Sequence, residues 1–128
     1  FFYKKVPSEK HRAIYETVRR ANAAAEAILK PGVPLCEVDK AARQIIEDAG
    51  YGPNFTHRLG HFIGLEVHEY GDVSSANTKV AEVGNIFSIE PGIYVEGEVG
   101  VRIEDLVLIT EDGCEILNSF SKELDILE

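Results

Sequence analysis

The sequence has no long apolar run, no excess of positive charge and no closely spaced cysteines. No stretch of its 128 residues approaches the roughly 20 apolar positions that a membrane-spanning helix needs. Its 13 basic and 22 acidic residues give a net charge of −9, which disfavours nucleic acids and anionic membranes as main partners because both would be repelled. The charges of the first segment follow its apolar residues, which is not the order of a signal peptide.

Cysteine is scarce, and its positions carry no motif. Cys36 and Cys114 lie far apart in the sequence, without the spacing of a metal-binding pair. We expect two buried, reduced thiols of a cytoplasmic protein. The sequence alone leaves a disulfide between them open.

The sequence does contain enough apolar material, 45% of its residues, for the core of one domain over residues 1–128. Ser8 predicts the N-cap of a helix over about the next twenty residues, which the Lys-Pro-Gly run at 30–32 ends. A second helix fits about 37–49, and Gly50 follows its end. The apolar stripes predicted to be buried are Ile14, Val18, Ala21, Ala25 and Ile28 in the first helix, and Val38, Ala41, Ala42, Ile45 and Ile46 in the second.

From residue 51 onward, glycine and β-forming residues replace alanine and glutamate. Strands are predicted over 86–90, 93–95, 101–109 and 114–117, with turns at 96–98 and 111–113. Residues 1–6 resemble the end of a strand entering from upstream, and residues 121–128 allow one helical turn at most. Two helices followed by antiparallel strands predict the α+β class.

Three of the four histidines, His57, His61 and His68, fall within twelve residues. The segment is not the helical zinc-peptidase signature, because Gly60 and Gly64 would each cost a helix about 1 kcal/mol relative to alanine. In an extended chain His57 and His61 share a face, because their separation is even. His68 could join them after a bend at Gly64. Histidines scattered in a loop without a common role are the alternative.

Two glutamates, Glu90 and Glu104, lie in apolar, strand-forming surroundings, where a carboxylate is costly to bury unless it is paired or bound to a metal. Both are seven residues from Gly97, so in a simple hairpin they would lie opposite each other, about 5 Å apart. Protonation of one carboxylate, compensation by Arg102, or a divalent metal would relieve the repulsion. A bulge at Pro91 would spoil this register, and an exposed charged hairpin is the alternative.

Imidazole and carboxylate groups from separate strands, without thiolates, suit Mn, Co, Fe or Zn. A metal held there would activate water for hydrolysis. The residue types and their spacing therefore predict the half-site of a metallohydrolase.

The segments 56–61 (Thr-His-Arg-Leu-Gly-His) and 64–69 (Gly-Leu-Glu-Val-His-Glu) resemble the histidine region of the metallopeptidases with the pita-bread fold. The segments 88–94 (Ser-Ile-Glu-Pro-Gly-Ile-Tyr) and 100–105 (Gly-Val-Arg-Ile-Glu-Asp) resemble its two glutamate regions. The likeness covers nearly the whole chain. Within the family, the Val-Arg-Ile-Glu-Asp run at 101–105 is more similar to the Xaa-Pro peptidases than to the methionine aminopeptidases. The His-Arg-Leu-Gly-His start at 57–61 and residues 121–124 (Ser-Lys-Glu-Leu) are most similar to bacterial Xaa-Pro dipeptidases, or prolidases.

The resemblance implies a role for each matching residue. His61, Glu90 and Glu104 would be metal ligands, and Glu90 would also shuttle a proton of the attacking water. His57 and His68 would hold the substrate and steady the tetrahedral intermediate. The implied reaction is hydrolysis of the peptide bond before proline, in dipeptides or short peptides, by water activated between two divalent ions. Manganese is the first candidate, with cobalt or zinc as alternatives, and the complete enzyme would be a cytoplasmic homodimer.

The resemblance also implies supporting roles and two departures. Tyr94 and Arg102 would stand near the substrate and the ligand carboxylates. Phe62 occupies a position that is often glycine in the family, and is expected to affect the pocket wall. The family's remaining ligands are two aspartates upstream of this chain, and no aspartate here matches them: Asp39, Asp48, Asp72 and Asp112 lie in predicted helices or turns, and Asp105 adjoins Glu104.

We therefore expect residues 1–128 to be the C-terminal part of a catalytic domain. Two divalent ions carry four positive charges, whereas Glu90 and Glu104 supply two negative charges. The chain alone should bind one metal weakly or none, should not turn over substrate, and should dimerise or aggregate through an exposed strand edge. The alternatives are a Xaa-Pro aminopeptidase, a non-catalytic pita-bread module that binds peptides or proteins, and a methionine aminopeptidase or creatinase-like hydrolase.

Overall fold

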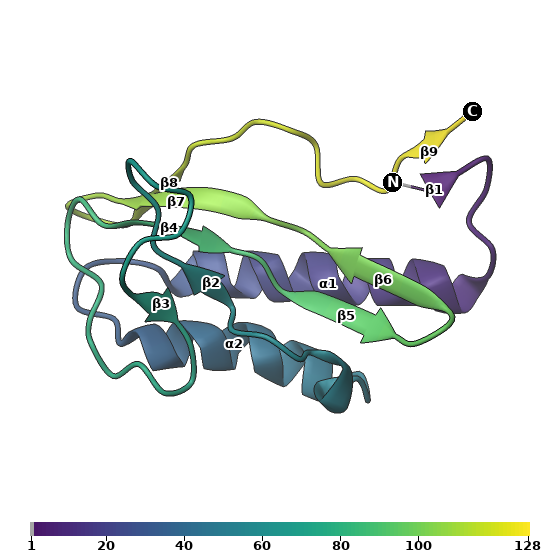
Figure 1. The fold of residues 1–128 in the computed structure, drawn as a ribbon, viewed down its shortest axis with the longest axis horizontal. Coiled ribbons are helices and arrows are strands. Elements are labelled where there is room, and N and C mark those ends of the chain that lie inside the picture. The colour runs from purple at the N-terminus through teal and green to yellow at the C-terminus, as the bar shows by residue number, and fades with distance from the viewer. Residues whose placement is uncertain (1) are drawn as a thin grey trace.

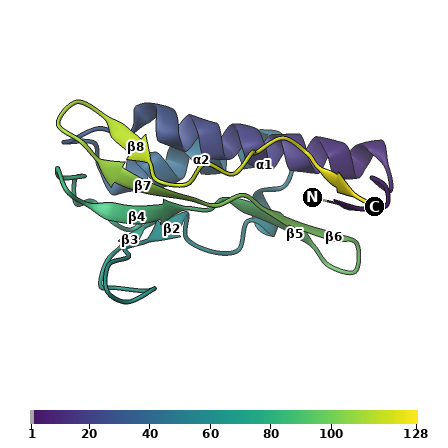
Figure 2. The same cartoon turned by 90° about the horizontal axis from the view of Figure 1, so that it is seen from above.

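Two long helices lie on one side of an antiparallel ribbon of strands (Figures 1 and 2). The computed structural model describes residues 2–128. It confirms the predicted α+β class, with helices preceding most of the strands. The elements are β1 (Phe2–Tyr3), α1 (Glu9–Ile28), α2 (Leu35–Asp48), a 3-10 turn η1 (Gly52–Asn54), β2 (Gly60–His61), β3 (Asp72–Val73), β4 (Ile86–Ile89), β5 (Gly92–Val95), β6 (Val99–Arg102), β7 (Asp105–Ile109), β8 (Cys114–Ile116) and β9 (Ile126–Leu127).

Helix α1 begins where the sequence predicts. The Ser8 side chain accepts a hydrogen bond from the backbone N–H of His11 at 3.3 Å, as an N-cap does. The predicted stripe is buried except for Ile28, which is 38% exposed. The prediction that Ile28 is buried was wrong. The helix ends at Ile28, and the extended backbone of Leu29 directs the Leu29 side chain into the core instead.

Helix α2 begins at Leu35, two residues earlier than predicted, and ends at Asp48 rather than 49. Pro34 provides no side-chain cap. The first amides of the helix instead donate to distant carbonyls, Leu35 to Lys79 and Cys36 to Asn77. This tertiary capping satisfies free helix N–H groups but leaves no local sequence signal. At the other end, Gly50 has the positive φ of 86° that follows many helices.

One register runs through the whole ribbon. Strands β4 and β7 pair up to Ile89 with Asp105, and β5 and β6 resume at Gly92 with Arg102. Two residues on each strand separate these pairs, so no extra residue interrupts the register. The predicted strand over 101–109 is nevertheless divided into β6 and β7. Pro91 has no N–H to donate, which removes a ladder bond at the break.

The ends of the chain pair with each other, since β1 runs parallel to β9 with Phe2 beside Ile126. Residues 121–128 contain no helical turn, because this long-range pairing keeps the tail extended. The predicted strand over 1–6 is shorter, Phe2–Tyr3, and Phe1 lies outside the described residues.

The two cysteines are not bridged, and both are half-buried rather than buried as predicted. Cys114 lies on the outer strand β8, where packing covers only one side of it. Within residues 2–128, no helix combines the length and the hydropathy needed to cross a membrane.

Candidate metal centre

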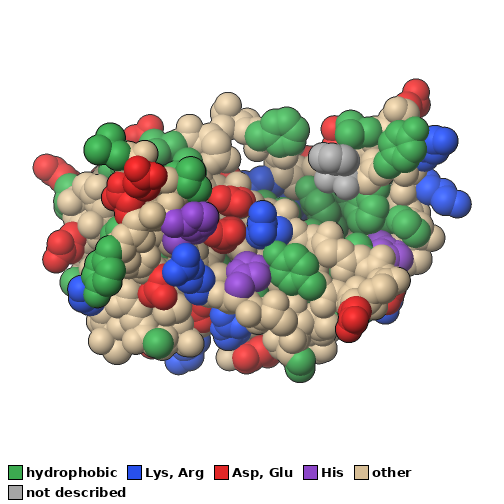
Figure 3. All heavy atoms as spheres, viewed as in Figure 1, with side chains coloured by type: hydrophobic (Ala, Val, Ile, Leu, Met, Phe, Trp, Pro, Cys, Tyr) green, Lys and Arg blue, Asp and Glu red, His purple; other side chains and the backbone are tan. Residues whose placement is uncertain are grey.

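The strands separate two chemically different faces. Along β6 and β7, Val101, Ile103 and Asp105 are buried toward the helices, whereas Arg102 and Glu104 are exposed on the other side. Figure 3 shows this second face, where histidine, acidic and basic side chains gather near the middle of the molecule. The candidate site is built on this face.

His61, Glu90 and Glu104 converge there. Their ligand atoms all lie within 4.8 Å of one another, and Nε2 of His61 is 3.4 Å from Oε1 of Glu90. Bonds from nitrogen or oxygen to a divalent metal are about 2.1 Å long, so donors on opposite sides of an ion are about 4.2 Å apart. Small side-chain movements would therefore close this donor set around an ion. Imidazole and carboxylate are also suitable ligands for such a metal.

The opposition of Glu90 and Glu104 follows from the register of the ribbon, as the spacing from Gly97 predicts. The two positions fall between the paired residues of β4–β7 and β5–β6. Pro91 introduces no bulge. Glu90 is almost covered, with 13% of its side chain exposed, whereas Glu104 is 41% exposed.

Gly60 and Ser88 join the strand of His61 to the strand of Glu90. The backbone N–H of His61 donates to Oγ of Ser88 at 3.0 Å, and that hydroxyl donates to Oε1 of Glu90 at 2.9 Å. A Cβ at Gly60 would lie 1.8 Å from the Ser88 carbonyl oxygen, so only glycine permits this approach. The role of Ser88 was not predicted from the sequence, although its position two residues before Glu90 places both side chains on one face of a strand.

The ring of His61 is oriented for a ligand at Nε2. Its Nδ1 lies 3.0 Å from the carbonyl oxygen of Phe62 and must donate to it, since a carbonyl only accepts. The lone pair of the neutral ring is then at Nε2, which faces Glu90. The Phe62 ring itself packs against Phe87, with the ring centroids 5.3 Å apart.

The His68 ring lies beside the His61 ring, which the bend predicted at Gly64 allows. The two imidazole centroids are 4.2 Å apart. The turn is closed by the Glu69 N–H, which donates to the Phe62 carbonyl, and the Glu69 carboxylate occupies the space that a side chain at Gly64 would need. His68 remains exposed on the open face.

Arg102 supplies positive charge between the two glutamates. Its Nε lies 3.7 Å from a carboxylate oxygen of Glu90 and 3.7 Å from one of Glu104. The interaction with Tyr94, and after it the charges of the two glutamates, raise the pKa of Arg102 against the opposing effect of burial. Compensation by Arg102, one of the three solutions left open by the sequence, is therefore present in the structure.

His57 lies beside Tyr94 rather than within the ligand set. Its Nδ1 donates to the Arg58 carbonyl at 2.7 Å, so Nε2 of the neutral ring accepts from the Tyr94 hydroxyl at 3.0 Å. The extended segment predicted for the histidine region is a strand only at Gly60–His61.

Sequence reasoning missed the ion pair that holds the His57 loop. Asp39 is fully buried on α2 and binds Arg43 one turn later at 2.8 Å. Arg43 also donates to the carbonyl groups of Phe55 and His57, and Asp39 accepts the N–H of Leu59. The spacing of Asp39 and Arg43, i and i+4 on a predicted helix, could have indicated the ion pair. The hydrogen bonds of this pair to the loop could not be predicted from the sequence.

The fold and the site together define an α+β domain in which His61, Glu90 and Glu104 could hold a metal ion. The model of the metallopeptidase family M24 matches residues 1–111, and the chain belongs to this family. An uncharacterized peptidase of Staphylococcus haemolyticus is 54% identical over 116 residues, which are 91% of this chain and 33% of that protein.

Solved structures show the same relationship. A prolidase from Pyrococcus horikoshii is 46% identical with a TM-score of 0.91, over 94% of this chain and 35% of that one. An X-Pro aminopeptidase from Thermotoga maritima is 41% identical with a TM-score of 0.89, over 95% of this chain and 34% of that one. The chain thus spans about a third of the length of these relatives, and its helices and strands correspond to the C-terminal part of the pita-bread fold.

Proposed function

We propose that this chain forms the C-terminal part of the active site of a Xaa-Pro dipeptidase. The convergence of His61, Glu90 and Glu104 carries the proposal, because it provides ligands for a divalent cation on an open face. Membership of a metallopeptidase family and the likeness to solved prolidases support it. We further propose that two aspartates upstream of this chain complete a centre for two ions, manganese first among them. Cytoplasmic location and assembly of the complete enzyme as a homodimer are parts of the same proposal.

The residues of the chain would divide the work by position. Divalent cations bound at the centre would supply an activated water as the nucleophile. Glu90 is the candidate to accept a proton from the attacking water and pass it to the leaving nitrogen, since it is nearly enclosed and close to His61. His68, exposed beside His61, is placed to donate to the oxygen on which negative charge develops.

His57 and Tyr94 would serve the substrate together. The Tyr94 hydroxyl and the His57 ring form one hydrogen-bonded unit, so each fixes the orientation of the other. Arg102 would restrict the rotation of the Glu90 and Glu104 side chains through its two ion pairs. About half of its own side chain remains exposed. A proline-containing dipeptide would approach over this exposed edge.

A substrate panel tests the proposal on the complete protein that carries this chain. The panel contains a Xaa-Pro dipeptide, the matching Xaa-Ala dipeptide and a longer peptide beginning Xaa-Pro, each with added manganese. We expect cleavage of the Xaa-Pro dipeptide only, and its loss in Glu104→Gln. Cleavage of the longer peptide would instead establish an aminopeptidase. Peptide binding without cleavage of any substrate would establish a non-catalytic module and overturn the proposal.

A further inference from the structure

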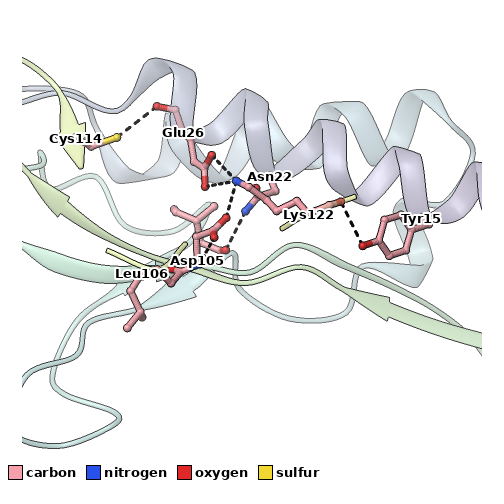
Figure 4. A network of polar contacts seen from close by, with 9 residues as sticks. Tyr15, Asn22, Glu26, Asp105, Leu106, Cys114 and Lys122 are labelled. Carbon is pink, nitrogen blue, oxygen red and sulfur yellow. Dashed lines mark hydrogen bonds and ion pairs between the residues drawn. The ribbon is translucent and has the colours of Figure 1, made fainter. Parts of the chain in front are cut away.

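A buried polar cluster lies behind the candidate metal centre, on the helix side of the ribbon (Figure 4). At its middle is Nζ of Lys122, from the C-terminal tail. It donates to Oδ2 of Asp105 at 2.7 Å, to Oδ1 of Asn22 at 2.8 Å and to both carboxylate oxygens of Glu26 at 3.0 and 3.1 Å. We call these four residues the Lys122 cluster.

Two arms of the cluster end next to the two glutamate ligands. Asp105 directly follows Glu104 in the chain. Nδ2 of Asn22 donates at 3.3 Å to the carbonyl of Ile89, which directly precedes Glu90. Successive residues of a strand point to opposite faces, so anchoring Asp105 and the Ile89 carbonyl from behind sets where Glu104 and Glu90 emerge in front.

The composition of the cluster is difficult to explain by packing alone. Asp105 is 2% exposed and occupies an inward position that is apolar at Val101, Ile103, Val107 and Ile109. The carboxylates of Asp105 and Glu26 are buried beside the ammonium group of Lys122, whose side chain is 29% exposed, and burying such charges is costly compared with well-packed apolar residues. A further side chain, Asn118, donates to Oδ1 of Asp105 at 2.6 Å, so this carboxylate is held on both oxygens. Hydrogen bonds on both oxygens restrict the rotation of the Asp105 side chain.

We infer that Lys122 is a positioning residue for the metal centre. It ties the strand of Glu90, through Asn22, to the strand of Glu104, through Asp105, and so sets the separation of the two carboxylates. The tail of the chain therefore contributes to metal affinity without reaching the metal. This inference rests on the metal centre of the proposed function.

The test is manganese affinity, measured by isothermal titration calorimetry on the complete protein. Lys122→Met keeps the length of the side chain but removes its charge. We expect it to raise the Kd for Mn²⁺ by about 10- to 100-fold, the usual effect of removing a group that orients ligands. Asn22→Ala breaks only the arm to Ile89 and should cause a smaller rise in the Kd for Mn²⁺. It replaces Lys122→Met as the test variant if the Lys122 variant does not fold.

Tyr15→Phe is the matched control. The Tyr15 hydroxyl donates to the carbonyl groups of Lys122 and Glu123, so it anchors the same tail without touching Nζ. It should leave the Kd unchanged. Equal effects of Tyr15→Phe and Lys122→Met would mean that Lys122 only anchors the tail, and would overturn the inference. Unchanged affinity in both folded cluster variants would overturn it too. If the unmodified protein binds no Mn²⁺, the proposed function fails first and the inference fails with it.

Discussion

Glu26 should make the stability of this chain depend on pH in an unusual direction. Its side chain is only 11% exposed, and this burial, followed by the hydrogen bond with Asp105, raises the pKa of Glu26 from 4.5 to about 7, against the opposing effect of Lys122. Between these two values the folded chain binds a proton that the unfolded chain has released. The free energy of unfolding therefore falls as the pH rises from about 4.5 to about 7, and its Glu26 contribution is level above that.

The size of the effect follows from the two pKa values. Their difference, at about 1.4 kcal/mol per unit, corresponds to ~3 kcal/mol of unfolding free energy. Glu26→Gln resembles the protonated side chain, because its amide can still donate to Asp105 and accept from Lys122. The variant should therefore match the unmodified chain near pH 4 and exceed it by ~3 kcal/mol at pH 8.

Urea denaturation followed by circular dichroism, at several pH values between 4 and 8, measures this difference. Glu111→Gln, in an exposed turn, is the control and should follow the unmodified chain throughout. If Glu26→Gln lowers stability equally at every pH, the carboxylate is ionised across the range and the reasoning from burial is refuted.

Two further variants test the supports of the site. Arg43→Ala leaves the buried carboxylate of Asp39 unpaired and should reduce the free energy of unfolding by about 3 kcal/mol in urea denaturation; a loss below about 1 kcal/mol would show that the pair is dispensable. Gly60→Ala places a Cβ against the Ser88 carbonyl, so it should lower the thermal midpoint sharply and weaken metal binding in calorimetry. Gly113→Ala, whose Cβ would have no neighbour closer than 4.0 Å, is its control, and equal behaviour of the two variants would contradict the steric argument.

Local patterns in the sequence were sufficient for the start of α1, for most of its buried stripe and for the opposition of the glutamates, whereas Ala41 and Ile45 of the stripe predicted for α2 are only partly buried. The stripe of α1 and the cap at Ser8 depend on neighbouring residues, and equal spacing from Gly97 sets the register of a hairpin. The division of the predicted strand over 101–109 into β6 and β7 was not predicted. Pro91 on the opposite strand could have indicated it, because proline lacks the N–H needed for a ladder hydrogen bond.

Contacts between distant segments could not be predicted in this way. The early start of α2 depends on the carbonyl groups of Asn77 and Lys79, and the pairing of β1 with β9 joins opposite ends of the chain. The Lys122 cluster combines α1, β7 and the tail, and each of its members alone resembles an ordinary polar surface residue. Motif similarity predicted His61, Glu90 and Glu104 as ligands, but it gave no indication of the Lys122 cluster behind them.

The most direct test of the metal centre is the metal content of the complete protein after reconstitution with manganese. We expect two ions per chain in the unmodified protein, and substantial loss in His61→Ala and in Glu104→Gln, with Glu111→Gln unchanged. The 128-residue chain by itself should retain one ion weakly or none. Full metal content in both ligand variants would contradict the assignment of His61 and Glu104 and, with it, the proposed active site.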